Sequence, residues 1–249
     1  MADGDRPSLD PPPVAAAGAM NDLPVRLVSG VFMAGLAIIA LWFGGWPWIA
    51  FVVLLAGLVL WEWNLLTREF GVSPMSEVAW QFLGALYVGA AALAVIQVRL
   101  NYDMWTVLLV FLAPVVAVDV GAYFAGRTIG GPKLIPAVSP SKTWAGLFGG
   151  MVAASLVLIT IEVADLGAAS GPGYTPLAIA LAALTGSLVA ILAQAGDLFE
   201  SWMKRRAGVK DSGRLIPGHG GLFDRLDGFI MVFFVLFLVA VVPAYLGLQ

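Results

Sequence analysis

The sequence contains no cysteine and only one histidine, His219. Without cysteine the chain can form no disulfide, no thiolate metal site and no cysteine nucleophile. A single histidine excludes a multi-histidine metal site. Charge is also scarce, because Asp, Glu, Lys and Arg make up 12% of the 249 residues, against about 25% in soluble domains. The alternating segments of about ten residues that would indicate a membrane β-barrel are absent as well.

Hydrophobic residues instead make up 60% of the chain. They gather in runs long enough to cross about 30 Å of hydrocarbon, at roughly 27–44, 47–66, 78–97, 104–124, 144–164, 176–196 and 228–247. We therefore predict an all-α, polytopic transmembrane helical bundle with about seven spans. The number rises to eight or nine if short or re-entrant helices lie in the longer loops. Only Gly44, Gly45 and Trp46 separate the first two runs, which predicts a tight helical hairpin.

Lysine and arginine are unevenly distributed between the loops. If the N-terminus is cytoplasmic, 12 of the 13 bases fall on the cytoplasmic side and only Arg99 on the other. The positive-inside rule then predicts an N-in, C-out orientation. Residues 1–24 are rich in Pro, Ala and Asp and show no signal-peptide pattern, so we predict a disordered cytoplasmic tail. The remainder divides into N-terminal transmembrane helices (25–100) and a C-terminal catalytic transmembrane domain (101–249), with cytoplasmic loops 125–143 and 197–227.

The loop 197–227 holds five acids and six bases, with hydrophobic runs on both sides. Its first polar residues recur at helical spacing, so they share one face if the preceding span continues as a helix: Asp197, Glu200, Ser201, Lys204 and Arg205. Paired carboxylates without a histidine cluster suit Mg²⁺, and the bases suit phosphate oxygens. Glycines around His219 would let backbone amides approach an anion. The pattern indicates a nucleotide or pyrophosphate site at the membrane surface.

Simpler interpretations of these features stay open. A basic loop can serve topology and lipid headgroups alone. The run from Ser139 to Thr143 precedes a span, where it is either only a helix cap or also an anion site. Asp119 lies inside an apolar run, and is either functional or a carboxylate satisfied by Tyr123 or Arg127. We interpret Glu62, near the end of its span, as interfacial.

Two motifs resemble a known family. The run Ser201-x-x-Lys204-Arg205-x4-Lys210-Asp211-x-Gly213-x3-Pro217-x-His219-Gly220-Gly221-x-x-Asp224-Arg225-x-Asp227 is similar to the signature of the phosphatidate cytidylyltransferases over 27 residues without a gap. The segments from Asp119 to Arg127 and from Ser139 to Trp144 resemble the upstream conserved region of that family. Two positions there depart from it, because Ser141 replaces a common Lys and Ala145 a common Glu.

The resemblance implies an enzyme that condenses CTP with phosphatidic acid to give CDP-diacylglycerol and pyrophosphate. It further implies Mg²⁺ as cofactor (one ion or two), a homodimer in the lipid bilayer, and no nucleic-acid partner. By position, Asp197 and Asp224 match metal-binding aspartates. The matching catalytic positions are Lys204, Arg205, Lys210, Asp211, His219, Arg225 and Asp227. The matching substrate-binding positions are Ser139, Lys142, Thr143, Ser201, Gly220 and Gly221.

The expected location is the bacterial inner (cytoplasmic) membrane, with the active site facing the cytoplasm, where CTP is found. Two other functions compete with this one. An ion-coupled transporter would explain Asp119 and the polar span ends, although no internal repeat is visible. A lipid-binding scaffold would explain the basic loop, although it would not need the interspersed acids.

Overall fold

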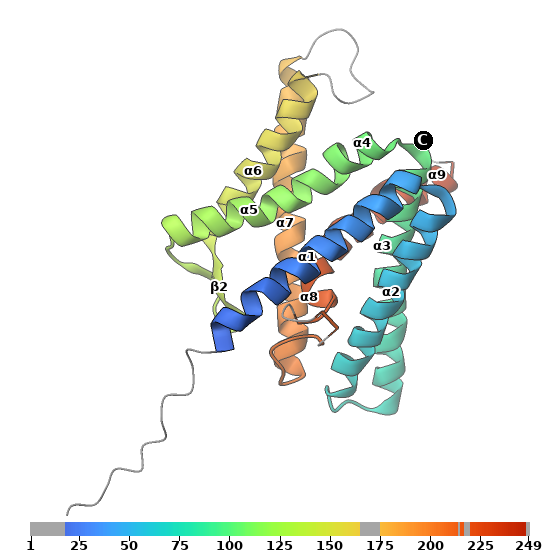
Figure 1. Ribbon diagram of the computed structural model, residues 1–249, viewed down its shortest axis with the longest axis vertical. Coiled ribbons are helices and arrows are strands. Elements are labelled where there is room, and N and C mark those ends of the chain that lie inside the picture. Colours follow the sequence, from blue (N-terminus) through green and yellow to red (C-terminus); the bar gives the residue numbers. More distant parts are fainter. Residues whose placement is uncertain (1–17, 165–174, 214, 217–219, 248–249) are drawn as a thin grey trace, which may run out of the picture.

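The computed structural model describes residues 18–164, 175–213, 215–216 and 220–247, with side chains described from residue 28 onward. Most of these residues are helical, as Figure 1 shows. The elements in chain order are α1 (Gly18–Phe43), α2 (Gly45–Arg68), α3 (Pro74–Asn101), α4 (Met104–Thr106), the π-helical η1 (Val107–Leu112), α5 (Ala113–Thr128), β1 (Lys133–Ile135), β2 (Ser139–Thr143), α6 (Trp144–Val163), α7 (Pro176–Arg206), α8 (Phe223–Leu236), the π-helical η2 (Phe237–Val241) and α9 (Val242–Tyr245).

Six helical segments of the described chain are long and apolar enough to cross a membrane. They are 45–68, 74–101, 104–128, 144–163, 176–206 and 223–245. The predicted helical membrane bundle is confirmed at this level. The remaining predicted span, at 27–44, corresponds to α1. The described apolar part of α1 is the shorter stretch Val28–Phe43. Seven spans and the N-in orientation therefore stay predictions.

The helices form two packed groups that α8 connects. α2 and α3 form an antiparallel pair, while α5, α6 and α7 pack against one another in series. α8 packs against both α3 and α7 (Figure 1). The turn between α1 and α2 is as tight as predicted, because Gly44 and Gly45 adopt φ angles of 61° and 48°, which residues with a side chain rarely adopt.

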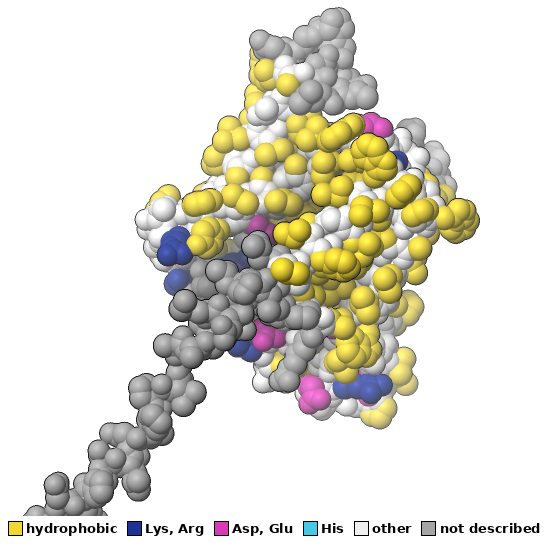
Figure 2. All heavy atoms as spheres, in the orientation of Figure 1, with side chains coloured by type: hydrophobic (Ala, Val, Ile, Leu, Met, Phe, Trp, Pro, Cys, Tyr) yellow, Lys and Arg dark blue, Asp and Glu magenta, His cyan; other side chains and the backbone are white. Residues whose placement is uncertain are grey.

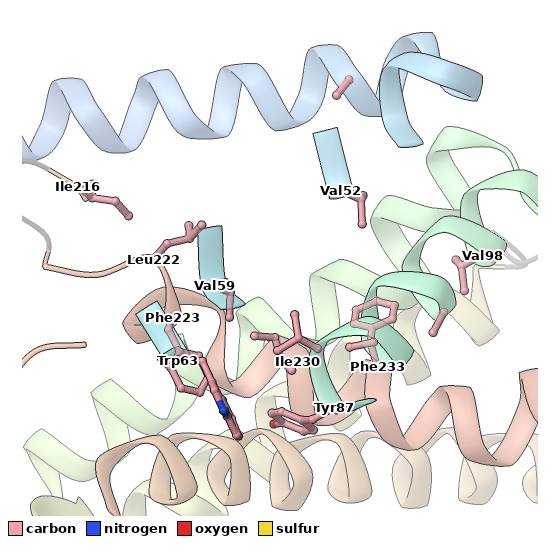
Figure 3. Packing of buried hydrophobic residues seen from close by; sticks show 14 of the residues in the cluster. Val52, Val59, Trp63, Tyr87, Val98, Ile216, Leu222, Phe223, Ile230 and Phe233 are labelled. Atoms are coloured by element: carbon pink, nitrogen blue, oxygen red, sulfur yellow. The ribbon is translucent and has the colours of Figure 1, made fainter. Parts of the chain in front are cut away.

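The core between α2, α3, α7 and α8 is aromatic. Trp63 is fully buried, and its ring lies 5.8 Å from that of Phe223 and 6.1 Å from that of Tyr87, measured between centroids. Figure 3 shows these three side chains facing one another from α2, α8 and α3. The indole of Trp63 donates a 2.9 Å hydrogen bond to the Trp80 carbonyl, so its polar atom is satisfied. This packing fixes the end of α2 against the start of α8.

Small residues allow α5 and α6 to approach closely. A side chain at Gly121 would overlap the backbone carbonyl of Gly149, and one at Gly149 would overlap the backbone of Gly121. Close contact between small residues is a main source of helix association in lipid, where the hydrophobic effect between helices is weak. The contact holds α6 and its preceding strand β2 beside α5.

Both π-helical stretches come just before a proline. η1 ends at Leu112 and Pro114 follows, while η2 ends at Val241 and Pro243 follows. Proline has no amide hydrogen and its ring crowds the carbonyl four residues earlier. A widened turn accommodates this carbonyl, which is one known setting for π-bulges.

Two segments outside the long spans differ from the simplest sequence-based expectation. Residues 18–24, predicted as part of a disordered tail, belong to α1, because extending an existing helix costs far less than nucleating one. Loop 125–143 contains no re-entrant helix: α5 continues to Thr128 and the antiparallel strands β1 and β2 follow. Glycines 130 and 131, with φ of 67° and 90°, end the helix and begin the hairpin.

The charged residues lie mostly at one end of the bundle. Figure 2 shows hydrophobic side chains over the middle of the visible face, with most of its Lys, Arg, Asp and Glu side chains toward the lower end. At the opposite end, Arg99 donates hydrogen bonds to the carbonyls of Leu41 (2.9 Å) and Tyr102 (3.2 Å). The 31 residues of α7 would span about 46 Å, so its final turns extend beyond about 30 Å of hydrocarbon.

Candidate active site

The last turns of α7 bring a lysine between two carboxylates. α7 continues beyond the predicted span into residues 197–206, so the polar residues at helical spacing share one face. Nζ of Lys204 lies 2.6 Å from Oε2 of Glu200, one turn earlier, and 2.7 Å from Oδ1 of Asp224 at the start of α8. The Glu200 side chain is only 1% exposed and that of Asp224 only 8%. Burial strengthens such an ion pair and makes loss of one partner costly.

Backbone amides complete the surroundings of Asp224. Its Oδ2 accepts hydrogen bonds from the amides of Ser212 (3.0 Å) and Gly221 (2.8 Å). Gly220 adopts a φ of 83°, and a side chain there would approach Oδ2 to 3.1 Å. The backbone here approaches a protein carboxylate closely, and Asp224 has a partner at each oxygen.

A second lysine–carboxylate pair joins the upstream motif to the same end of α7. Lys142 on β2 makes a short ion pair with Asp197. Asp227, one turn into α8, lies within hydrogen-bonding reach of Asp197, and the amide of Gly228 donates a 2.8 Å bond to it. Asp119 on α5 also interacts electrostatically with Asp197 and Lys142. Four segments that are far apart in sequence therefore meet here.

Asp119 thus lies among charged groups of the site. The alternative, in which Tyr123 or Arg127 satisfies it, has no support in the described contacts, because Arg127 donates to the Tyr123 hydroxyl at 2.7 Å. A cleft of about 550 Å³ opens beside Asp119 between α5, β2, α6 and α7. Its lining residues are Asp119, Ala122, Tyr123, Gly126, Arg127, Ser141, Lys142, Thr143, Gly146 and Gln194. This size is typical of ligand sites.

The remaining predicted residues are placed around these pairs. Thr143 caps α6, since its hydroxyl accepts from the Gly146 amide at 3.1 Å. Ser139 is buried near Ser141, and Ser201 is half-buried on α7. Arg205 donates to the Val138 carbonyl at 3.3 Å, which ties α7 to the hairpin. Thr143 thus has a structural role whatever it contacts in a substrate complex.

Several exposed residues of the predicted loop 197–227 lie around the buried ion pairs. Lys210, Asp211 and Arg225 are exposed, and Arg225 interacts electrostatically with Asp119. Arg205 and Lys210 line a second, shallower cleft of about 370 Å³. His219 lies outside the described residues.

Sequence reasoning missed one residue of this region. Glu62 on α2, interpreted as interfacial, is fully buried. Its carboxylate accepts hydrogen bonds from the Ser212 hydroxyl (3.1 Å) and from the amides of Leu222 (3.0 Å) and Phe223 (2.7 Å). That interpretation was wrong because the loop before α8 folds over the end of α2 and supplies the donors. The local sequence WEWN gives no sign of partners some 150 to 161 residues away.

The carboxylates of the site are the type of side chain that binds a hard divalent cation. Asp197 and Asp224 are each paired with a lysine ammonium, and carboxylate oxygens are the ligands that Mg²⁺ prefers. Oε1 of Glu200, also buried, makes no hydrogen bond within the described part of the chain. Among the described residues, no three Asp, Glu or His side chains already stand as a metal-binding group. The metal prediction therefore stays a prediction.

Comparison with known proteins identifies the class as a transferase of nucleotidyl groups. The chain belongs to the cytidylyltransferase family, whose sequence model matches residues 65–242. A phosphatidate cytidylyltransferase of Brucella suis is 40% identical over 210 residues, which cover 80% of this chain and 74% of that protein. One of Bacillus subtilis is 39% identical over 194 residues (76% and 67%), and one of Rickettsia bellii 32% over 221 residues (88% and 91%).

These matches confirm the resemblance that the two motifs indicated, and they extend it upstream of those motifs. The match begins near the end of α2 and includes α3. The two motifs did not cover this part of the chain, which resembled the family only in its hydropathy. The family assignment gives no support to the transporter alternative.

Proposed function

We propose that the protein transfers the cytidylyl group of CTP to phosphatidic acid, releasing pyrophosphate and leaving CDP-diacylglycerol in the membrane. The observation that carries the proposal is the meeting of the two lysine–carboxylate pairs, Lys142–Asp197 and Lys204–Asp224, at one end of the bundle. They come from the two motifs that resemble the phosphatidate cytidylyltransferases. The names of the 30–40% identical relatives support the same substrates.

The chemistry needs positioning and charge neutralisation more than it needs a base. A phosphate oxygen of the lipid attacks the α-phosphorus of CTP, a new P–O bond forms, and the bond from the α-phosphorus to the pyrophosphate oxygen breaks. Phosphate monoesters are mostly ionised at pH 7, so the attacking oxygen has little need of deprotonation. Lysine and arginine lower the barrier by stabilising the charge on the phosphoryl oxygens.

The cleft suits the phosphate end of a lipid substrate. Lys142 and Arg127 line it, and both bear charges that pair with phosphate. It lies between helices apolar enough to be in the membrane, so acyl chains could stay in the bilayer while the phosphate reaches Lys142. The exposed Lys210 and Arg205 line the second cleft and would bind the triphosphate of an incoming nucleotide there.

Asp197 and Asp224 would hold Mg²⁺, which when bound supplies positive charge to the phosphates. The lysines now on these carboxylates would then be available to phosphate oxygens. Lys142 lies at the cleft and Lys204 between α7 and α8, so the two ammonium groups would reach the substrates from different sides. Glu200 keeps one oxygen without a described partner and is placed to orient Lys204.

The proposal is tested with purified protein in detergent, radiolabelled CTP, phosphatidic acid and Mg²⁺, following label into lipid. We expect label in the lipid fraction only when the α-phosphate is labelled, together with one pyrophosphate released per label. Label from the γ-phosphate in lipid, or hydrolysis of CTP without lipid labelling, would contradict it. Absence of transfer, combined with substrate uptake into vesicles, would favour the transporter.

We further propose a homodimer in the bacterial inner membrane with this site on the cytoplasmic side. The separation of bases between the two ends of the bundle supports that orientation. The absence of cysteine makes single-cysteine labelling clean. Val209, just after α7, is 37% exposed and is a suitable probe, whereas Ser212 in the same loop is only 4% exposed. Val209→Cys should react with an impermeant thiol reagent only from the cytoplasmic side, and Ala164→Cys only from the other.

The opposite labelling pattern would refute the cytoplasmic placement of the site and with it the seven-span, N-in topology, and reaction of both positions from one side would show that α7 does not cross the membrane. Mass measurement of the detergent-solubilised protein at several concentrations tests the dimer, which a monomer at every concentration would contradict.

A further inference from the structure

Glu62 and Asp224 are held by the same short segment of chain. Ser212 connects them directly, because its amide donates to Asp224 while its hydroxyl donates to Glu62. Gly221 donates to Asp224, and the next two amides, of Leu222 and Phe223, donate to Glu62. The hydrogen bonds to the two carboxylates therefore alternate along one loop, and moving the loop relative to Glu62 would move the donors of Asp224.

Glu62 also supplies what α8 lacks at its N-terminus. The residue before α8, Leu222, has no side chain that could cap the helix, and the first amides of a helix have no partner within it. The Glu62 carboxylate accepts two of these amides from a different helix. A negative charge there also interacts favourably with the helix dipole. Asp224 stands in the first turn of that helix, so the cap determines where its side chain lies.

The segment is shaped around the Glu62 side chain. A side chain at Gly213 would overlap the Glu62 carboxylate, and one at Gly221 would overlap both this carboxylate and the Ser212 hydroxyl. Glycine is thus required at both positions by close packing against Glu62. The match to the cytidylyltransferase family begins at residue 65, so Glu62 lies just outside the sequence that defines the family here.

We propose that Glu62 is a positioning residue of the transferase site, which fixes Ser212 and residues 221–223 so that the amides of Ser212 and Gly221 face Asp224. This rests on the function proposed above. The Glu62 carboxylate is fully buried and already accepts three hydrogen bonds, so it acts through Asp224 and Lys204 and not by touching substrate. Its loss should therefore lower kcat and leave substrate binding at the cleft largely intact.

The first test replaces Glu62 by glutamine. The amide keeps the shape, but its NH₂ group faces N–H and O–H donors and can accept none of their hydrogens. We expect kcat to fall roughly 10- to 100-fold, as when groups that orient a ligand residue are lost, while the KM for phosphatidic acid changes less than about threefold. Ser212→Ala removes one donor of the three and should lower kcat less.

Thr67→Val is the matched control. Thr67 is a buried polar residue one turn further along α2, and its hydroxyl bonds to the Trp63 carbonyl and Gln81. It has no described contact with Ser212 or residues 221–223. Its loss should lower thermal stability without changing kcat. If Thr67→Val lowered kcat as much as Glu62→Gln, Glu62 would have only a general role in the fold and the proposal would fail.

A second readout does not depend on catalysis. Ile216 is 7% exposed and lies in the same segment, so a cysteine at this position reports whether the segment stays packed. We expect Glu62→Gln to accelerate thiol labelling of Ile216→Cys by at least about tenfold, since local opening controls such reactions, and Thr67→Val to leave it unchanged. Unchanged labelling together with unchanged kcat would overturn the proposal.

The two proposals can fail separately. Faster labelling in the Glu62→Gln background, with no cytidylyl transfer by the unmodified protein, would refute the proposed function and still show that Glu62 holds the segment. If Glu62→Gln does not yield folded protein, Ser212→Ala decides: a wild-type kcat in that variant would overturn the positioning role.

Discussion

The two halves of the bundle contribute to the site in different ways. The half made of α5 to α8 supplies every charge at the main cleft and both lysine–carboxylate pairs. The half made of α1 to α3 supplies one buried carboxylate, Glu62, and an aromatic core around Trp63 that holds α8 in place. In the function proposed above, the groups that would meet substrate and the groups that would hold them in place are separated along the chain. Mutations in the two halves should differ in whether they change chemistry or position.

The largest effects should come from the two aspartates proposed to hold the cation. Asp224→Asn and Asp197→Asn should each reduce transfer beyond the ~10–100-fold typical of residues behind a metal ligand, because an amide is a poorer and uncharged ligand for Mg²⁺. Steady-state transfer of labelled CTP into lipid measures this. Asp103→Asn, at the opposite end where Asp103 caps α4, is the control and should keep full activity. Near-normal turnover of either site variant at ordinary Mg²⁺ would refute its role as a ligand.

Lys142→Gln should have the next largest effect. It removes the ammonium group that pairs with Asp197 and lines the cleft, and loss of one such stabilising group costs roughly 10²-fold in kcat. Lys133→Gln is a matched control, since Lys133 lies on the paired strand β1 and is exposed. Equal kinetics for the two variants would mean that the hairpin lysines serve only topology.

A smaller effect is expected for the exposed base of the second cleft. Lys210→Gln should raise the KM for CTP about fivefold, which corresponds to about 1 kcal/mol for an exposed ion pair. The KM for phosphatidic acid should stay the same. The effect should shrink at high salt, because exposed charges are screened. An unchanged KM for CTP at low salt would mean that Lys210 does not bind CTP and serves membrane topology alone.

The smallest kinetic effect should come from the far end of the bundle. Arg99→Gln removes hydrogen bonds to the carbonyls of Leu41 and Tyr102, at a cost of about 1–2 kcal/mol of stability. Thermal unfolding in detergent should therefore begin at a lower temperature. The kcat of the protein that remains folded should not change. A loss of kcat would show that the two ends of the bundle are coupled, and would break the separation described above.

Much of the fold and of the charged site could be predicted because the signals are local. Apolar runs mark the spans, and the spacing of Asp197, Glu200 and Lys204 puts them on one face if the span continues as a helix, as α7 does in the structure. Such patterns depend on neighbours within one or two helical turns.

The misses depend on contacts between distant segments. An acid near a span end has the same local sequence whether it faces lipid headgroups or caps a helix 160 residues later, so Glu62 was misjudged. The burial of Ser212 follows from the same contact. The strands β1 and β2 have three and five residues, and the second contains Pro140, which weakens any strand signal. Tertiary packing decides each of these cases.

The place of Glu62 has a practical consequence for dividing the chain. A truncated protein beginning at residue 65, where the family match starts, would keep both motifs and every residue of the clefts. It would nevertheless leave the Ser212 hydroxyl and the amides of Leu222 and Phe223 buried without an acceptor, at a cost of about 1–3 kcal/mol for each unsatisfied group. Fragments and chimaeras of this protein should therefore be cut before α2, at the Gly44–Gly45 turn.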